Sequence, residues 1–306
     1  MLKSGNPIGN KKIIVIAGPT ASGKTSLAVS LATHLKCSII SADSRQFYKE
    51  LSIGTAKPTS DEMQGIPHYF VNSHSVEKPL SSGQFEIEGR KLVAQLFEKE
   101  DVLIVVGGSG MFIDALLYGT DQIPHSPKAR AHWNQEFELH GIAKLQEHLQ
   151  TIDPDFYKEV DIYNPARLIR AIEVFESTGI PFSFWRKNTE KKALYPLFYF
   201  VIDLPREVLY NRINQRVDEM IQKGLLEEVK ENMKFRHLQS LNTVGYKELF
   251  DYLDNKKTLE EAINLIKQNT RNYAKRQLTW FRKNKDAIYL NATSTDEQLR
   301  TILTSI

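Results

Sequence analysis

The stretch Gly18-Pro19-Thr20-Ala21-Ser22-Gly23-Lys24-Thr25 has the residue types and spacing of a phosphate-binding loop, G-x-x-x-x-G-K-[ST]. Its glycines allow backbone N–H groups to curl around an anion, and Lys24 adds a full positive charge. Thr25 supplies the hydroxyl that binds Mg²⁺ in such loops. An apolar run at 13–16 precedes the loop, and residues 26–29 continue as a helix. The sequence therefore predicts that a phosphate or diphosphate binds at residues 18–25.

Other candidate residues follow later predicted elements. Asp43 comes directly after a short buried strand at 37–40, and ligands of open α/β sheets gather beyond the carboxyl ends of strands. We expect Asp43 close to the phosphate-binding loop, where a carboxylate serves either as a general base or as a turn cap. Lys57, in a polar loop, could bring a second cation to the phosphates. Arg212 and Arg216 share a helix face, where they either reach the phosphates or pair with neighbouring carboxylates.

The strongly apolar strand expected at 102–106 ends in Gly107-Gly108-Ser109-Gly110. A P-loop ATPase usually carries an aspartate at this point to hold Mg²⁺. Glycines instead suit the close approach of a substrate to the backbone. This difference argues against nucleotide hydrolysis.

The elements that must position these residues alternate between strands and helices. Apolar runs predict strands at 13–16, 37–40, 68–71, 102–106 and 197–203, with helices between them. This order predicts an α/β fold with a P-loop-containing parallel sheet flanked by helices. Residues 120–195 show no strand pattern and read as a helical insertion domain, with amphipathic segments at 127–138, 142–150 and 165–176. We expect residues 1–119 and 196–306 to form the two parts of the core.

Composition limits the classes of protein to consider. The chain has 306 residues, of which 41% are hydrophobic and 25% charged, which is typical of a globular protein of two domains. Cys37 is the single cysteine, so an intrachain disulfide and a cysteine zinc site are excluded. Neither a signal peptide nor a membrane-spanning apolar run is present. We expect a cytoplasmic protein with no membrane association and no obligate protein partner.

The net charge of +3 is small, but its distribution is uneven. A long helix should begin at a capping box formed by Thr258 and Glu261. Tyr273, Trp280 and Phe281 are interleaved with its cations. Between residues 267 and 285 every charged residue is basic: Lys267, Arg271, Lys275, Arg276, Arg282, Lys283 and Lys285. Such a stretch either is a solvated helix face or binds nucleic acid, with phosphates on the cations and bases on the rings.

Taken together, these stretches resemble the tRNA dimethylallyltransferase family from about residue 13 to residue 282. The resemblance rests on the order and spacing of several motifs rather than on any single one. Besides the loop at 18–25 and Arg216, these are residues 43–46, 54–58, 107–109, 164–168 with Arg170, 244–246, and 274–277 with Trp280. Relatives often have a small residue where Arg45 stands, and this chain lacks the zinc finger of some eukaryotic members.

The resemblance implies transfer of a dimethylallyl group from dimethylallyl diphosphate to the N6 amine of adenosine 37 of tRNA, beside the anticodon. Mg²⁺ is the implied cofactor, and the loop at 18–25 would hold diphosphate rather than a nucleotide. Asp43 would be the general base, with Thr20 and Arg216 acting on the diphosphate. With the basic helix included, the anticodon stem-loop would contact Asp43, Ser44, Arg45, Gln46, Ser109, Arg130, Ala166, Arg167, Leu168, Ile169, Arg170, Lys275, Arg276 and Arg282.

Three other functions fit parts of the same pattern. A small-molecule or nucleoside kinase would use the same loop and could direct Asp43 at a hydroxyl. The basic helix and the missing aspartate after residue 106 argue against it. An isopentenyltransferase acting on free AMP or ADP is closer, but the motifs at Arg167 and Lys275 favour tRNA. A non-catalytic RNA-binding protein would not need both the loop and Asp43.

Overall fold

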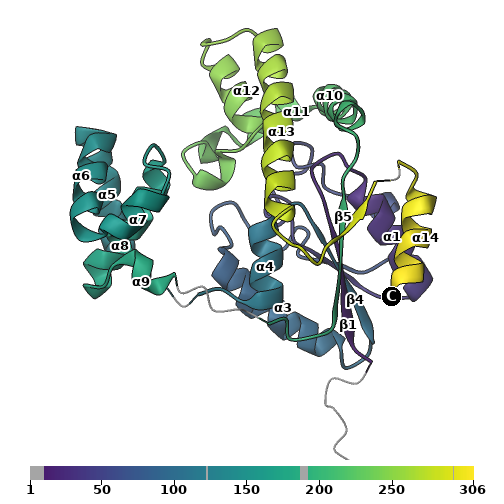
Figure 1. Cartoon of the computed structure of the whole chain (residues 1–306). Coiled ribbons are helices and arrows are strands. Elements are labelled where there is room, and N and C mark those ends of the chain that lie inside the picture. Colours follow the sequence, from purple (N-terminus) through teal and green to yellow (C-terminus); the bar gives the residue numbers. More distant parts are fainter. Residues whose placement is uncertain (1–9, 122, 187–191, 292) are drawn as a thin grey trace, which may run out of the picture. The chain divides into compact units, whose positions relative to one another are not determined.

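A computed structural model of the chain describes residues 10–121, 123–186, 192–291 and 293–306 (Figure 1). The chain forms two compact units. A core unit comprises residues 1–119 and 193–306, and an insertion unit comprises residues 120–192. The chain thus returns to the core unit at residue 193, slightly before the expected boundary at 195. In the described ranges no helix is long and apolar enough to cross a membrane.

The core unit is built on a six-stranded parallel sheet with the order β3-β2-β4-β1-β5-β6. The strands are β1 Lys12–Ala17, β2 Ile39–Ser41, β3 His68–Tyr69, β4 Val102–Gly107, β5 Leu197–Ile202 and β6 Ile288–Leu290. The central strands are buried on both faces, as their uninterrupted apolar runs require. This arrangement confirms the predicted fold class. Strand β6 was not predicted, because only three residues long and with Ile288 exposed it gives no clear apolar pattern.

Alternate residues of β1 pack into the two helical layers that cover the sheet (Figure 1). Ile13 and Val15 belong to one hydrophobic cluster, whereas Ile14 and Ile16 belong to the other. The first cluster includes α3 (Ser82–Leu96) and α4 (Gly110–Tyr118), and the second includes α1 (Lys24–Leu35), α10 (Arg206–Gln222) and α14 (Thr295–Ser305). Helix α14 was not predicted. The basic helix that was expected to be the last one is therefore followed by a further helix.

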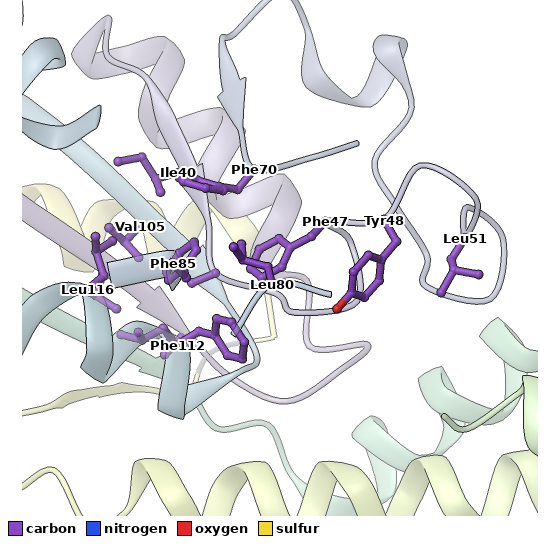
Figure 2. Packing of buried hydrophobic residues seen from close by; sticks show 14 of the residues in the cluster. Ile40, Phe47, Tyr48, Leu51, Phe70, Leu80, Phe85, Val105, Phe112 and Leu116 are labelled. Atoms are coloured by element: carbon purple, nitrogen blue, oxygen red, sulfur yellow. The ribbon is translucent and has the colours of Figure 1, made fainter. Parts of the chain in front are cut away.

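An aromatic group within the first cluster fixes the segment after β2. The rings of Phe47, Phe70, Phe85 and Phe112 pack edge-on or stacked, with centroids 4.7 to 6.0 Å apart (Figure 2). Phe47 is fully buried at the centre of this group. Because Phe47 lies four residues after Asp43, its packing anchors the segment that carries Asp43.

The C-terminal part of the core unit adds a helical layer containing α12 (Tyr246–Leu253) and the long α13 (Leu259–Phe281). Helix α13 starts with the predicted capping box of Thr258 and Glu261. It ends at Phe281, so Arg282 is its C-cap, and Lys283 and Lys285, which were also expected on this helix, follow it. The shorter helices are α2 Ser60–Met63, α11 Leu225–Glu231, η1 Met233–Phe235 and η2 Gln239–Leu241.

The insertion unit contains helices and no strand in the part of it that the structure describes. These are α5 Pro127–His140, α6 Ile142–Ile152, α7 Pro154–Glu159, α8 Pro165–Thr178 and α9 Phe182–Trp185. They enclose a separate hydrophobic core around Trp133, Leu145, Leu149 and Ile172. The amphipathic segments predicted the three long helices, but α7 and α9 are too short to show a helical period.

Candidate active site

The phosphate-binding loop joins β1 to α1, as its sequence predicts. Gly23 precedes α1 with φ 95°, and Ala21 also has a positive φ of 61°. The Lys24 ammonium folds back on the loop and donates a 2.8 Å hydrogen bond to the Pro19 carbonyl oxygen. Burial lowers the pKa of Lys24 to about 8, although the neighbouring Asp43 carboxylate opposes this shift. The loop therefore presents a cation whose charge an arriving anion would stabilise.

Two cavities meet beside this loop. The loop cavity, of about 510 Å³, is lined by residues 20–26 together with Asp43, Gln46, Lys57 and others. The helix cavity, of about 480 Å³, is lined by residues 242–245 and by side chains that include Arg45, Tyr273 and Arg276. Six residues line both cavities: Thr20, Asp43, Thr55, Ala56, Arg216 and Met220. The three residues expected to carry the chemistry, Asp43, Thr20 and Arg216, thus all lie where the two cavities adjoin.

Charges at this junction influence one another. Burial lowers the pKa of Arg216, and the Asp43 carboxylate is the first charge that offsets the effect. Burial also raises the pKa of Tyr273 to about 12, with Asp43 adding to the rise. Tyr273 is therefore neutral at neutral pH. The Asp43 carboxylate and the Arg216 guanidinium thus lie where both cavities are open to them.

Asp43 is held by a short turn. Its Oδ1 accepts a 3.3 Å hydrogen bond from the backbone N–H of Arg45, and its carbonyl oxygen accepts one from Gln46. The predicted capping function is therefore present, but the same residue also lines both cavities. The Ser44 N–H donates to Ser109 Oγ at 3.1 Å, which ties this turn to the end of β4.

The Arg45 guanidinium donates to the Ser240 carbonyl oxygen at 2.8 Å. This hydrogen bond holds the Arg45 side chain at the wall of the helix cavity. Gln46 Nε2 donates to the Ala56 carbonyl oxygen at 3.3 Å and lines the loop cavity. Both residues thus hold backbone segments around the junction.

A buried carboxylate that the sequence analysis missed shapes the shared wall. Glu228 on α11 accepts hydrogen bonds from the backbone N–H groups of Ser52, Ile53 and Gly54 at 2.8 to 2.9 Å. It also accepts a short hydrogen bond from the Tyr246 hydroxyl. A Cβ at Gly54 would lie 2.6 Å from the Tyr246 ring. The motifs at 54–58 and 244–246 are therefore neighbours that Glu228 joins, which no local sequence signal reveals.

The glycines at the end of β4 have a packing reason in addition to the one expected. A Cβ at Gly107 would lie 2.4 Å from the Ala42 carbonyl oxygen, so no side chain fits there. A Cβ at Gly108 would lie 2.3 Å from the amide nitrogen of Gln277. The protein itself thus approaches the backbone closely at both positions, and Gly107 also lines the loop cavity. The same crowding excludes a metal-binding aspartate at residue 107.

Two cations suggested as phosphate ligands make hydrogen bonds within the protein, although Lys57 also lines the loop cavity. The Lys57 ammonium donates to the Tyr48 carbonyl oxygen and to Asn72 Oδ1. Arg212 donates to the Ser22 carbonyl oxygen at 3.4 Å, which supports the phosphate-binding loop from outside. Of the arginine pair on α10, only Arg216 lines the cavities.

The basic stretch on α13 is partly neutralised by other elements. Lys267 pairs with Asp218 at 2.6 Å and Arg282 with Asp203 at 3.1 Å. Lys275 and Arg276 are exposed, and Arg276 stacks over the Tyr273 ring with 5.8 Å between its Cζ atom and the ring centroid.

The three interleaved aromatics have three different environments. Trp280 is 40% exposed and donates its Nε1–H to Asp114 at 3.0 Å. Tyr273 lines the helix cavity. Phe281 is buried in the core, so the expectation that it stacks on a base is wrong. Phe281 lies on the apolar side of this amphipathic helix, which packs against the core.

In the insertion unit, Glu173 is fully buried and binds two of the residues expected to contact RNA. Its carboxylate accepts hydrogen bonds from Arg130 at 2.7 Å, from Arg170 at 3.0 Å and from His125. Burial raises the pKa of Glu173, but the Ser126 N–H and Arg130 outweigh it and lower the pKa below its usual value. Arg130 and Arg170 thus hold the N-terminal side of α5 against α8.

The first turn of α8 separates two kinds of residue. Ala166 and Arg167 are exposed, and Asn164 caps the helix by accepting from the Arg167 N–H. Leu168 and Ile169 are 0% and 4% exposed within the hydrophobic core of the unit. Their side chains cannot contact RNA there, so we correct the expectation for these two residues. Their apolar side chains instead indicate that they pack in the core of this unit.

The site suits a magnesium ion that is coordinated mainly by a bound diphosphate and only to a small extent by protein side chains. Thr25 lines the loop cavity. Among the residues that the structure describes, no group of three or more His, Cys, Asp or Glu side chains could enclose a metal. Mg²⁺ typically binds through one or two protein groups plus substrate phosphates and water. A diphosphate beside Thr25 would supply such oxygens.

The fold and the loop define a P-loop protein whose phosphate site adjoins a second cavity. The family model described as IPP transferase matches residues 46–284. The chain is 46% identical over 278 residues to the tRNA dimethylallyltransferase of Cytophaga hutchinsonii, covering 90% of this chain and 91% of that protein. It is also 46% identical over 275 residues to the enzyme of the same name from Christiangramia forsetii, covering 90% and 91%. The chain therefore belongs to the tRNA dimethylallyltransferase family.

Solved structures agree with this assignment. The tRNA Δ2-isopentenylpyrophosphate transferase of Staphylococcus epidermidis aligns with a TM-score of 0.71 at 36% identity, covering 96% of this chain and 98% of that one. A eukaryotic dimethylallyltransferase acting on tRNA aligns with a TM-score of 0.79 at 26% identity, covering 96% and 77%. The resemblance inferred from the motifs is confirmed.

Proposed function

We propose that this chain transfers a dimethylallyl group from dimethylallyl diphosphate to the N6 amine of adenosine 37 in tRNA. The products are N6-dimethylallyladenosine in the RNA and free diphosphate. The observation that carries this proposal is the wall shared by the two cavities, where Thr20, Asp43 and Arg216 lie together. A donor in one cavity and an acceptor base in the other would meet at these side chains.

The loop cavity suits the diphosphate. Its N–H groups, the α1 N-terminus and Lys24 favour negative charge, and Arg216 adds a second cation at the junction. The buried Ser22 hydroxyl has no hydrogen-bond partner in the described part of the protein, as expected of a loop that receives an anion. The reactive allylic carbon would then point towards the helix cavity.

The helix cavity suits the adenine. N6 forms a bond to the C1 carbon of the donor while the bond from C1 to the diphosphate oxygen breaks. The electron pair of that bond leaves with the diphosphate, where Thr20, Lys24 and Arg216 stabilise the added negative charge. The N6 proton passes to the Asp43 carboxylate, which makes the weakly nucleophilic amine competent. When bound, Mg²⁺ supplies further neutralisation of the diphosphate, with Thr25 as its protein ligand.

The RNA would lie on the surface around the helix cavity. Lys275 and Arg276 on α13 are exposed beside that cavity, and Ser44, Arg45 and Ser109 lie at its wall or next to it. In the insertion unit the exposed Ala166 and Arg167 remain candidate contacts, as do the partly exposed Arg130 and Arg170. An adenine inside a cavity must leave the stack of the anticodon loop, an ordinary cost for base-modifying enzymes.

The test compares acceptors with a single donor. Purified protein is incubated with dimethylallyl diphosphate and Mg²⁺ and with either tRNA, AMP or ADP, and the prenylated product is quantified. We expect prenylation of tRNA and none of the free nucleotides. Prenylation of AMP or ADP alone would reassign the acceptor. Transfer of the ATP γ-phosphate to a small molecule, without use of the allylic donor, would identify a kinase instead.

A further inference from the structure

Gln277 is a buried amide on α13 that contacts two segments of the candidate active site. It is 5% exposed, and its neighbours Lys275 and Arg276 on the same helix are exposed. A polar side chain buried in a helix face must satisfy both its donor and its acceptor, or it destabilises the fold. Gln277 does so with backbone groups rather than with other side chains.

Its acceptor holds the phosphate-binding loop. Gln277 Oε1 accepts a 2.9 Å hydrogen bond from the backbone N–H of Thr20. Thr20 lines both cavities and lies within the loop that would receive the diphosphate. The contact joins residues 257 positions apart in the chain, so local loop structure cannot replace it.

Its donor holds the end of β4. Gln277 Nε2 donates a 2.8 Å hydrogen bond to the Gly108 carbonyl oxygen. A Cβ at residue 108 would lie 2.3 Å from this nitrogen, so any larger residue there would displace the amide from its present place. The glycine thus allows the amide to bridge β4 and the phosphate-binding loop. One planar group fixes two strand ends of the sheet relative to each other.

We propose that Gln277 is a positioning residue that sets the place of Thr20 for prenyl transfer. It touches neither of the two cavities, so its effect passes through the Thr20 backbone. Only a group that accepts from Thr20 and donates to Gly108 at the same time can fill this position. The proposal rests on the proposed function, since it concerns the rate of that reaction.

The first test removes both hydrogen bonds with little change in volume. Gln277→Met should lower the single-turnover rate of prenyl transfer about 10- to 100-fold at saturating substrates, because small displacements of reacting groups are costly. The affinity for tRNA should not change. Gln268→Met, at an exposed position of the same helix, is the matched control and should behave as the wild type. Rates are compared well below the unfolding temperature of each variant.

The second test uses a residue that switches its hydrogen-bonding capacity with pH. In Gln277→Glu the ionised carboxylate accepts from Thr20 but cannot donate to Gly108. The protonated carboxyl group does both, and burial raises the pKa of such a group. The rate of the variant divided by that of the wild type should therefore rise as pH falls from about 8.5 to about 6. A loss of stability alone would not give this pattern.

The outcomes distinguish a failure of the proposed function from a failure of the positioning role of Gln277. If the wild-type protein transfers no prenyl group, the proposed function itself fails. If the wild type is active and Gln277→Met transfers at the same single-turnover rate, the positioning role is wrong. A rate ratio for Gln277→Glu that does not change with pH would also overturn it.

Discussion

Asp43 and Arg216 lie together on the wall that the loop cavity shares with the helix cavity. Burial lowers the pKa of Arg216, and the Asp43 carboxylate partly offsets that effect. A carboxylate and a cation thus stand between the proposed place of the donor and the proposed place of the acceptor. Each of the two cavities also has charged groups of its own, so mutations can test the binding of the donor and the binding of the RNA separately.

Replacing Asp43 tests the general base. Asp43→Asn should lower the single-turnover rate of prenyl transfer by about two to four orders of magnitude, the usual contribution of a positioned base. Binding of tRNA and of diphosphate should change little, because the side-chain volume is kept. Rapid-quench measurements with Asp61→Asn, at an exposed position of α2, provide the control. A near-normal rate for Asp43→Asn would leave Asp43 with only its turn-forming role.

The pKa of Lys24 predicts how donor binding depends on pH. Burial lowers this pKa to about 8 in the free protein, and a diphosphate binds the protonated form more tightly. Lys24 is mostly protonated below pH 8 and mostly neutral above it, so the affinity should fall as pH rises through this value. Calorimetric titration with diphosphate should show the decline in the wild type and in the exposed control Lys91→Met. Lys24→Met should bind weakly at every pH, and a decline that persists in this variant would refute the assignment.

Ion pairing decides which exposed cations at the C-terminal end of α13 should bind RNA. Lys275, Arg276 and Arg282 are all exposed, but Arg282 pairs with Asp203. Replacing Lys275 and Arg276 with Gln should reduce the slope of log affinity against log salt by about 1.4 to 1.8, the value for two phosphate contacts. Arg282→Gln should change the slope much less. Filter binding with tRNA measures both, and equal slopes in the double variant and the wild type would make α13 a solvated face.

The Glu228 contacts predict a stability effect away from the chemistry. Tyr246→Phe removes the hydroxyl that donates to the buried Glu228 carboxylate. Loss of one partner of a buried charged group typically costs about 1 to 3 kcal/mol of unfolding free energy. Urea unfolding should show this loss, with Tyr252→Phe on the same helix as the control. Equal stability of the two variants would mean that Glu228 is held by the loop N–H groups alone.

Local patterns predicted the parts of the site that lie within single segments. The strand, loop and helix at residues 12–35 follow from apolar periodicity and glycine spacing, and Asp43 follows from its place after β2. Short elements such as β6, α7 and α9 carry too few residues to show a period. The buried state of Leu168 and Ile169 was readable from their apolar types, but the motif they belong to suggested RNA contact instead.

Long-range contacts account for what the sequence did not reveal. Glu228 joins α11 to residues more than 170 positions away, and Gln277 reaches Thr20 across 257 positions. Both are polar residues within amphipathic helices, where a solvated side chain is the ordinary expectation. Likewise, the ion pairs of Lys267 and Arg282 use aspartates from other elements. Charge counted along one helix therefore overstated the number of free cations.

The identity of the nucleoside formed tests the proposed transfer most directly. Unmodified tRNA is incubated with the protein, Mg²⁺ and dimethylallyl diphosphate, then digested, and its nucleosides and RNA fragments are analysed by mass spectrometry. We expect N6-dimethylallyladenosine, located at the adenosine just 3′ of the anticodon, and far less of it with Asp43→Asn in the same reaction time. Adenosine that stays unmodified at this position with the wild-type protein, or a prenyl group found elsewhere in the tRNA, would contradict the proposal.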